Sequence, residues 1–166
     1  MVLGICFTLA SALNAAPVFV PGEHFTLAWT HSIEKVRWEE DYAVVAPAAP
    51  GLPPVLHALQ ARIKGSAAGM EPPSDAVLRN GWYSYTPTQT VVPELLLTRS
   101  EFTADYDWCV AGRCQPLSDF IASDTGITRV RACFGIEKTM QISPTDPAVG
   151  SSLANTGKQS IRSVRR

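Results

Sequence analysis

The chain has little charge, and the charges that it has nearly cancel. Only 17% of its 166 residues are charged, the formal net charge is −1 and the sequence pI is about 6.3. A nucleic-acid-binding protein would carry a basic face, so this balance argues against that class. The low charge content and the 13 prolines exclude a coiled coil or a long helical bundle. A mean hydropathy of +0.05 is too low for a polytopic membrane protein.

Charge is missing altogether from the start of the chain, where the first ionic side chain is Glu23. The apolar run Val2–Leu13, followed by the small residues Ala15 and Ala16, is typical of a signal peptide, although no Lys or Arg precedes it. A membrane anchor over residues 1–20 and a buried N-terminal strand or helix are the alternatives. A signal peptide or an anchor would place the rest of the chain outside the cytoplasm, and an anchor would bring residues 1–20 into contact with the membrane.

The remaining charges divide the chain into an acidic body and a basic end. Residues 23–157 hold 10 basic and 15 acidic residues, a net charge of −5, whereas every charged residue after them is basic. Residues 143–166 are polar, rich in Ser and Thr and poor in large apolar groups, which predicts a disordered basic tail. We therefore expect one folded domain over residues 23–135.

Of the four cysteines, Cys6 lies in the apolar head and the other three lie in the body. Cys109 and Cys114 flank a turn that contains glycine, and a disulfide across such a hairpin has the Cα separation that these bonds need. Pairing of Cys133 with either of them is the alternative, which would leave one odd thiol. A zinc site is disfavoured because C-x4-C lacks a second pair of ligands. A disulfide is typical of an oxidising compartment.

No segment has the apolar spacing of an amphipathic helix, and no internal repeat is present. Instead, short segments alternate apolar and polar residues with the period of two that is typical of half-buried strands. Proline or glycine separates these segments, which favours an all-β fold, either an antiparallel β-sandwich or an open barrel. The segment 56–63, for which a short helix is the alternative, would place His57, Leu59, Ala61 and Ile63 on one strand face. The predicted strands cover residues 25–29, 36–44, 56–63, 78–85, 94–99 and 105–117.

The densest polar cluster of the sequence spans residues 30–41. Within it, Glu40 shares its strand face with two aromatic residues, and a buried carboxylate requires a partner. We expect His31 to be that partner, in a pair that either bridges two strands or binds a ligand. Ser32 would point to the opposite face of a strand from His31, which disfavours a Ser–His catalytic pair.

A glycine-containing loop, residues 64–73, is the second candidate site. Its lysine precedes its glycines and no helix pattern follows, so it is not a phosphate-binding P-loop. Either it is a flexible turn, or the backbone around Gly65 and Gly69 holds an anion together with Arg62 and the His31–Glu40 pair. No nucleophile–base pair and no metal-ligand set is evident in the sequence. We therefore predict no catalytic residue, metal or cofactor, and a hydrolase or metalloenzyme is the least favoured class.

Three motifs of the chain resemble, in order, those of the bacterial domain-of-unknown-function family 1850. They are residues 25–42, the 62–73 loop and residues 100–105, and the resemblance covers roughly residues 24–120. It implies a small exported protein without assigned catalytic activity, encoded beside tripartite ATP-independent periplasmic (TRAP) transporters of the TAXI type.

The resemblance thus implies a non-enzymatic accessory module of the periplasm. Its partner would be the TRAP membrane subunit or the solute-binding protein. Aromatic residues are enriched at interfaces, so edge strands and the segment Trp82–Tyr85 are the expected contacts, with core packing as the alternative for these aromatics.

Overall fold

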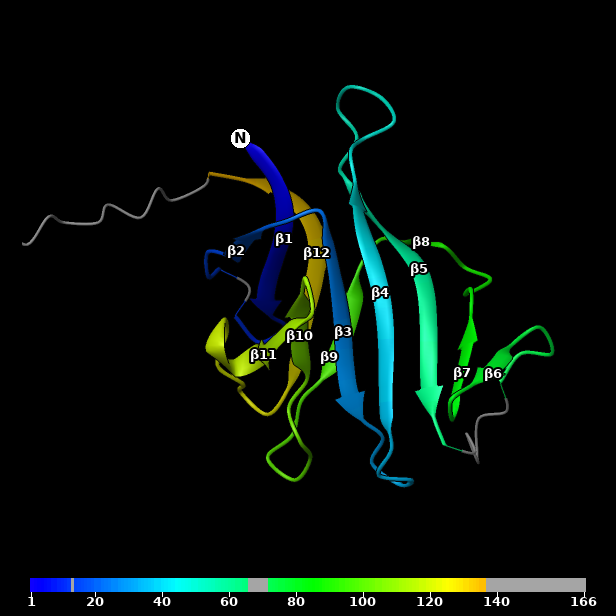
Figure 1. Cartoon of the computed structure of the whole chain (residues 1–166). Coiled ribbons are helices and arrows are strands. Elements are labelled where there is room, and N and C mark those ends of the chain that lie inside the picture. The colour runs from blue at the N-terminus through cyan, green and yellow to red at the C-terminus, as the bar shows by residue number, and fades with distance from the viewer. Residues whose placement is uncertain (13, 66–71, 137–166) are drawn as a thin grey trace, which may run out of the picture.

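The computed structural model describes residues 1–12, 14–65 and 72–136, and within them the chain is built from antiparallel strands (Figure 1). Two sheets are present, together with one short 3-10 helix, η1 (Leu117–Asp119), and no α-helix is seen in this part of the chain. The sheets pack against each other without closing into a barrel. The prediction of an all-β, antiparallel fold is therefore confirmed.

The smaller sheet has the strand order β2-β1-β12-β9, and the larger has the order β11-β10-β3-β4-β5-β7-β6, with β8 paired to β5. The strands of the small sheet are β1 (Val2–Leu9), β2 (Val18–Pro21), β9 (Leu95–Thr98) and β12 (Ile127–Gly135). The strands of the large sheet are β3 (His24–Thr30), β4 (Arg37–Val45), β5 (Val55–Lys64), β6 (Val77–Arg79), β7 (Trp82–Tyr85), β8 (Val91–Val92), β10 (Asp107–Val110) and β11 (Arg113–Pro116).

The apolar head of the chain is an inner strand of the small sheet. β1 pairs with β12 along its whole length and with β2 on its other side. Ile5 and Phe7 are 1% and 0% exposed, and Cys6, between them, forms a disulfide with Cys133 of β12. The structure therefore shows the buried strand, one of the three alternatives for residues 1–20. The small sheet thus includes strands from before residue 23, β1 and β2. None of the helical structure described is long and apolar enough to cross a membrane.

The main hydrophobic core lies between the two sheets and is centred on Trp108. The indole ring of Trp108 stacks on Phe25, with ring centroids 3.9 Å apart, and meets Phe7 edge-on at 5.0 Å. Because Phe7 belongs to the small sheet and the other two rings to the large one, these contacts join the sheets. The buried members of the core are Ile5, Phe7, Phe25, Leu27, Tyr42, Val44, Leu56, Ala58, Leu97, Trp108, Leu117, Val130 and Ala132.

The large sheet extends beyond the small one, so that β7 and β6 lie on the side away from β1 and β12 (Figure 1). Here the inner face of the large sheet has a second apolar cluster, built on the buried residues Trp38 and Ile63. Trp29, Tyr83 and Tyr85 are half-buried and pack against this pair. The aromatic segment Trp82–Tyr85 is thus partly a packing element of the sheet.

The alternating segments of the sequence form the strands expected at β3, β4, β5 and β9, and the helix considered for residues 56–63 is absent. The predicted strand over residues 78–85 is wrong in one respect, because it is a hairpin of β6 and β7. Asn80 and Gly81 at its turn have φ values of 53° and 78°, which a two-residue hairpin turn requires.

Strand β5 departs from strict alternation. Its register with β4 shifts between Asp41 and Tyr42, where Ala58 and Gln60 are the successive partners and Leu59 is the extra residue. This bulge leaves Leu59 exposed while Ala61 and Ile63 are buried. The expectation that His57 and Leu59 share a face with Ala61 and Ile63 is therefore wrong, since Leu56 and Ala58 are the buried residues before the bulge.

Candidate functional site

One disulfide joins the two strands of the β10–β11 hairpin, and the other joins β1 to β12. Cys109 and Cys114 stand opposite each other in the β10–β11 hairpin and are bonded, as the spacing predicted. Cys133 pairs with Cys6 rather than with either of them, so no thiol is left over. Two disulfides indicate an oxidising, exported environment.

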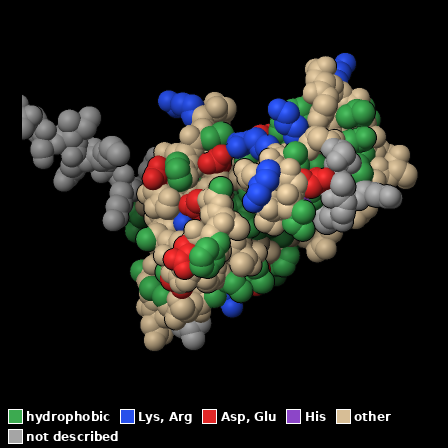
Figure 2. All heavy atoms as spheres, turned by 90° about the horizontal axis from the view of Figure 1, so that it is seen from below, with side chains coloured by type: hydrophobic (Ala, Val, Ile, Leu, Met, Phe, Trp, Pro, Cys, Tyr) green, Lys and Arg blue, Asp and Glu red, His purple; other side chains and the backbone are tan. Residues whose placement is uncertain are grey.

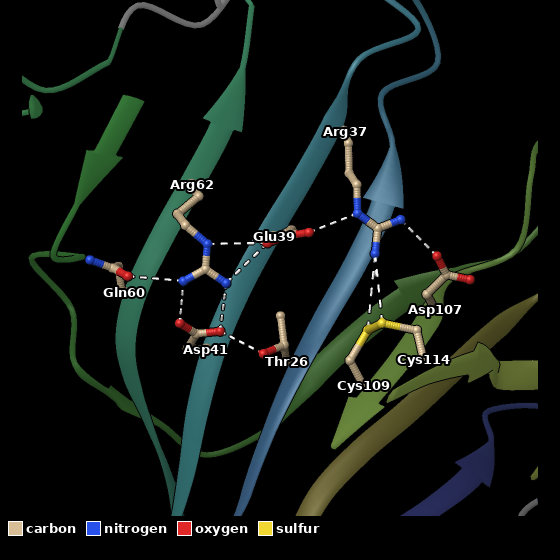
Figure 3. A network of polar contacts seen from close by, with 9 residues as sticks. All are labelled: Thr26, Arg37, Glu39, Asp41, Gln60, Arg62, Asp107, Cys109 and Cys114. Atoms are coloured by element: carbon tan, nitrogen blue, oxygen red, sulfur yellow. Dashed lines mark hydrogen bonds and ion pairs between the residues drawn. A yellow bond between two sulfur atoms is a disulfide. The ribbon is translucent and has the colours of Figure 1, made fainter. Parts of the chain in front are cut away.

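A network of charged side chains covers the outer face of the large sheet, the face turned away from the core (Figure 3). Arg62 of β5 lies between two carboxylates of β4. Its Nη2 donates hydrogen bonds to Glu39 at 3.0 Å and to Asp41 at 2.9 Å. Arg37 donates to the other oxygen of Glu39 at 2.7 Å and to Asp107 of β10 at 2.8 Å. The network therefore runs across the sheet from β5 to β10.

The pKa values of these groups follow from their contacts. Burial alone would raise the pKa of Asp41, but hydrogen bonds from Arg62 and Thr26 and the charge of Arg62 outweigh it and lower that pKa. The hydrogen bond to Asp41 is the main reason why the pKa of Arg62 is raised. Both guanidinium groups already have carboxylate partners, and partly exposed pairs of this kind each stabilise a fold by about 0–1 kcal/mol. The network joins neighbouring strands. All three guanidinium nitrogens of Arg62 already donate hydrogen bonds within it, so none is left to bind an anion.

Glu40 lies on the opposite face of β4 from Glu39, because neighbouring strand residues alternate. Its Oε2 accepts a hydrogen bond from the hydroxyl of Tyr42 at 2.5 Å. Burial and this carboxylate raise the pKa of Tyr42 far above its ordinary value. No cation pairs with Glu40 in the described ranges.

His31 has other contacts than the one expected. Its ring stacks on Trp38 at 4.8 Å between centroids, and its Nδ1 accepts the backbone N–H of Glu34 at 3.4 Å. Among the described contacts, His31 and Glu40 therefore do not form the predicted pair.

The predicted anion site is not assembled by the fold. Arg62 lies on the outer face and Glu40 on the inner face, on opposite sides of the same sheet. Gly65 has a φ of 97°, and its N–H donates to the carbonyl of Gly81 at 3.1 Å, so that this amide is already used. Gly69 lies outside the described residues, as do residues 143–166.

His31 and Ser32 both line a cavity of about 210 Å³. It lies at the end of the molecule where the β3–β4 loop meets residues 99–106. We call this region the loop end. Hydroxyl groups dominate the cavity lining, which includes Trp29, Thr30, His31, Ser32, Thr98, Thr103 and Tyr106. Two large apolar side chains adjoin this lining in sequence, Ile33 after Ser32 and Phe102 before Thr103, and they are 83% and 88% exposed.

A buried ion pair that the sequence did not reveal holds one side of the loop end. Arg99 is 3% exposed and donates two hydrogen bonds to Asp105, each at 2.9 Å. Its Nη1 also donates to the carbonyl of Ile121 at 2.8 Å, while Asp105 accepts the N–H of Ser118. Burial would raise the pKa of Asp105, but the hydrogen bonds and the charge of Arg99 lower it overall. In the sequence, the sign of this ion pair was Arg99 itself, an arginine directly after the apolar strand β9.

No group of three or more His, Cys, Asp or Glu side chains is placed to hold a metal ion in the part of the chain that is described.

Comparison with known proteins places the chain in a family. No curated protein and no solved structure matches it significantly. A family model, the domain of unknown function DUF1850, matches residues 25–117. The matched segment contains the outer-face network, the loop end and the Cys109–Cys114 hairpin, whereas β1, β2 and β12 lie outside it. Since the match covers more than half of the chain, this protein belongs to the DUF1850 family.

Proposed function

We propose that this protein is a non-enzymatic accessory module of the periplasm that docks on a TAXI-type TRAP transporter through its loop end. The observation that carries the proposal is the exposure of Ile33 and Phe102 on two loops that line one cavity. Large apolar side chains that are exposed on loops around one cavity can form a contact site, because burial in a partner removes their surface from water.

Both loops are held in place before any partner arrives. In the β3–β4 loop, the N–H of His31 donates to Val36 at 2.8 Å and the N–H of Lys35 donates back to His31 at 2.9 Å. The second loop is anchored by the buried pair of Arg99 and Asp105. Preorganised loops lose little conformational entropy on binding, which favours affinity.

The charges around the two apolar residues support a protein partner rather than a lipid surface. Glu34 and Lys35 follow Ile33, and Glu101 precedes Phe102 in the sequence. Figure 2 views the molecule from this end and shows hydrophobic, acidic and basic side chains on the same face. A surface of mixed charge suits a protein partner with complementary charges, whereas an anionic lipid surface attracts a uniformly basic one.

The choice of partner rests on the family resemblance, which implies an association with TAXI-type TRAP transporters. The two disulfides support a periplasmic location. The segment Trp82–Tyr85 is the weaker candidate contact, because Tyr83 and Tyr85 pack against the cluster of Trp38 and Ile63.

Co-purification tests this proposal. The full chain carrying an affinity tag is expressed with the TRAP membrane subunit and the solute-binding protein encoded beside it. The double variant Ile33→Ser/Phe102→Ser is compared with Leu52→Ser, which removes a 55%-exposed leucine from the β4–β5 loop at the opposite end of the molecule (Figure 1).

We expect the wild type and Leu52→Ser to recover a transporter component, and the double variant to recover at least about tenfold less of it, the equivalent of losing one well-buried anchor residue. The identity of the recovered subunit distinguishes the membrane component from the solute-binding protein. Failure of the wild type to recover either one, or equal recovery by the double variant, would reject docking through the loop end.

A further inference from the structure

A cavity of about 380 Å³ lies at the opposite edge of the large sheet from β6, between the β10–β11 hairpin and the small sheet. Trp108, Val110, Arg113 and Gln115 line it from the hairpin, and Val20 of β2 lines it from the small sheet. The register explains this wall, because Trp108 stands opposite Gln115 and Val110 opposite Arg113, so that all four residues share the inner face. The volume is in the range of small-molecule sites.

The charged side chain at the mouth of this cavity has no partner among the residues that the structure describes. Trp108 is 1% exposed, so its ring forms part of the inner wall while its indole N–H is closed off from the cavity. Arg113 is exposed at the mouth and has neither an ion pair nor a hydrogen bond with any described residue. The arginines of the outer-face network, in contrast, are all paired.

The lining combines one positive charge with apolar walls. Among the described residues, Arg113 is the only charged one that lines the cavity, and no carboxylate of that lining competes for its guanidinium. Gln115 adds an amide that can also donate, while Val20, Val110 and Phe120 supply apolar surface. The disulfide between Cys109 and Cys114 ties the two strands of the hairpin and so fixes the wall.

We propose that this cavity binds a small organic monocarboxylate with an apolar or aromatic body. The carboxylate would accept hydrogen bonds from the guanidinium of Arg113, a charge-assisted contact, and its body would lie against Val20 and Phe120. This site is distinct from the loop end and does not depend on docking to a transporter.

Binding is tested on the purified full chain with benzoate, phenylacetate and octanoate as probes, and with benzamide as the uncharged counterpart of benzoate. The indole N–H signal of Trp108 in 1H–15N NMR spectra reports occupancy of the cavity, and the signal of Trp82, on β7 at the far side of the sheet, is the internal control. We expect a saturable shift of the Trp108 signal with at least one carboxylate and none with benzamide.

The matched variants are Arg113→Gln and Arg79→Gln, since both arginines are exposed and have no polar contact among the described residues. Arg113→Gln should weaken carboxylate binding about tenfold, because a charge-assisted hydrogen bond is lost, and Arg79→Gln should leave it unchanged. No saturable shift with any of the carboxylates, equal binding of benzamide, or equal weakening by both arginine variants would overturn the proposal.

Discussion

Removing the Cys6–Cys133 disulfide should destabilise the protein much more than removing the Cys109–Cys114 disulfide. The first closes a loop between residues 127 positions apart, and the second between residues five positions apart. A cross-link restricts the unfolded chain, and the lost entropy rises with the logarithm of loop length. The relation gives about 5 kcal/mol for the long loop and about 2 kcal/mol for the short one.

The long cross-link also joins the two central strands of the small sheet. Without it, β1 and β12 are held together by their hydrogen bonds and by core residues such as Phe7 and Val130. Single domains unfold with a free energy of about 5–15 kcal/mol, so a loss of about 5 kcal/mol removes a third or more of the total. We therefore expect Cys6→Ala/Cys133→Ala to be only marginally folded at 37 °C.

The assay is urea unfolding of the oxidised proteins, followed by tryptophan fluorescence, which reports the environment of Trp108 in the core. The double variant Cys109→Ala/Cys114→Ala is the matched control, since it also lacks two sulfur atoms. Equal losses in the two variants, or a larger loss in the control, would refute the loop-length reasoning. Peptide mapping of the mature protein gives a second check, because a chain without its first 20 residues would contain Cys133 as a free thiol.

Three further predictions concern stability. Replacing Arg99 by Met leaves the half-buried carboxylate of Asp105 without its partner, so we expect a loss of about 1–3 kcal/mol by urea unfolding. Asp41 and Asp105 have lowered pKa values when folded. Their contribution to stability is therefore complete above the ordinary aspartate pKa of 3.8 and is lost as the pH falls through the folded values. Asp105→Asn should flatten the fall in stability that urea unfolding measures below about pH 4. Gly135→Ala would push a methyl group into the ring of Phe19, which covers this glycine, and should lower the urea midpoint by the equivalent of about 1–3 kcal/mol.

Local sequence patterns were enough to predict the three long strands of the large sheet, β3, β4 and β5. Alternation of apolar and polar residues marks β3 and β4 because one face of each strand packs against the core and the other does not. The Cys109–Cys114 disulfide was predictable for a similar reason, since a short turn with glycine brings the two residues opposite each other. Both inferences depend on residues that are close in the chain.

The same patterns failed where distant segments meet. The run at residues 2–9 has the composition of a signal peptide, and its role as a strand is visible only from its pairing with β12 at the other end of the described fold. The bond between Cys6 and Cys133 follows from that pairing. The hydrophobic strength of a segment shows that it avoids water, but not whether a lipid bilayer or a protein core takes it up.

The candidate sites show the same limit. The sequence pointed to Glu40 and Arg62 as one site, yet the pairing of Glu39 with Arg62 puts them on opposite faces of the sheet. The bulge at Leu59 makes the faces of β5 still harder to predict. One extra residue moves every side chain before it to the face opposite the one that strict alternation predicts. His31 and Ser32 do line a cavity, but its other wall comes from residues about 70 positions further along the chain.

The sequence by itself determined the all-β class and the family. Its cysteines also indicated disulfides and therefore an oxidising compartment. Each of these depends on composition, on local alternation or on motifs within one segment. Only the tertiary structure decided which strands pair across the chain, which cysteine Cys133 joins, and which polar groups share a cavity. Those features depend on the register between strands, and register is fixed by the packing of the whole core rather than by any one strand.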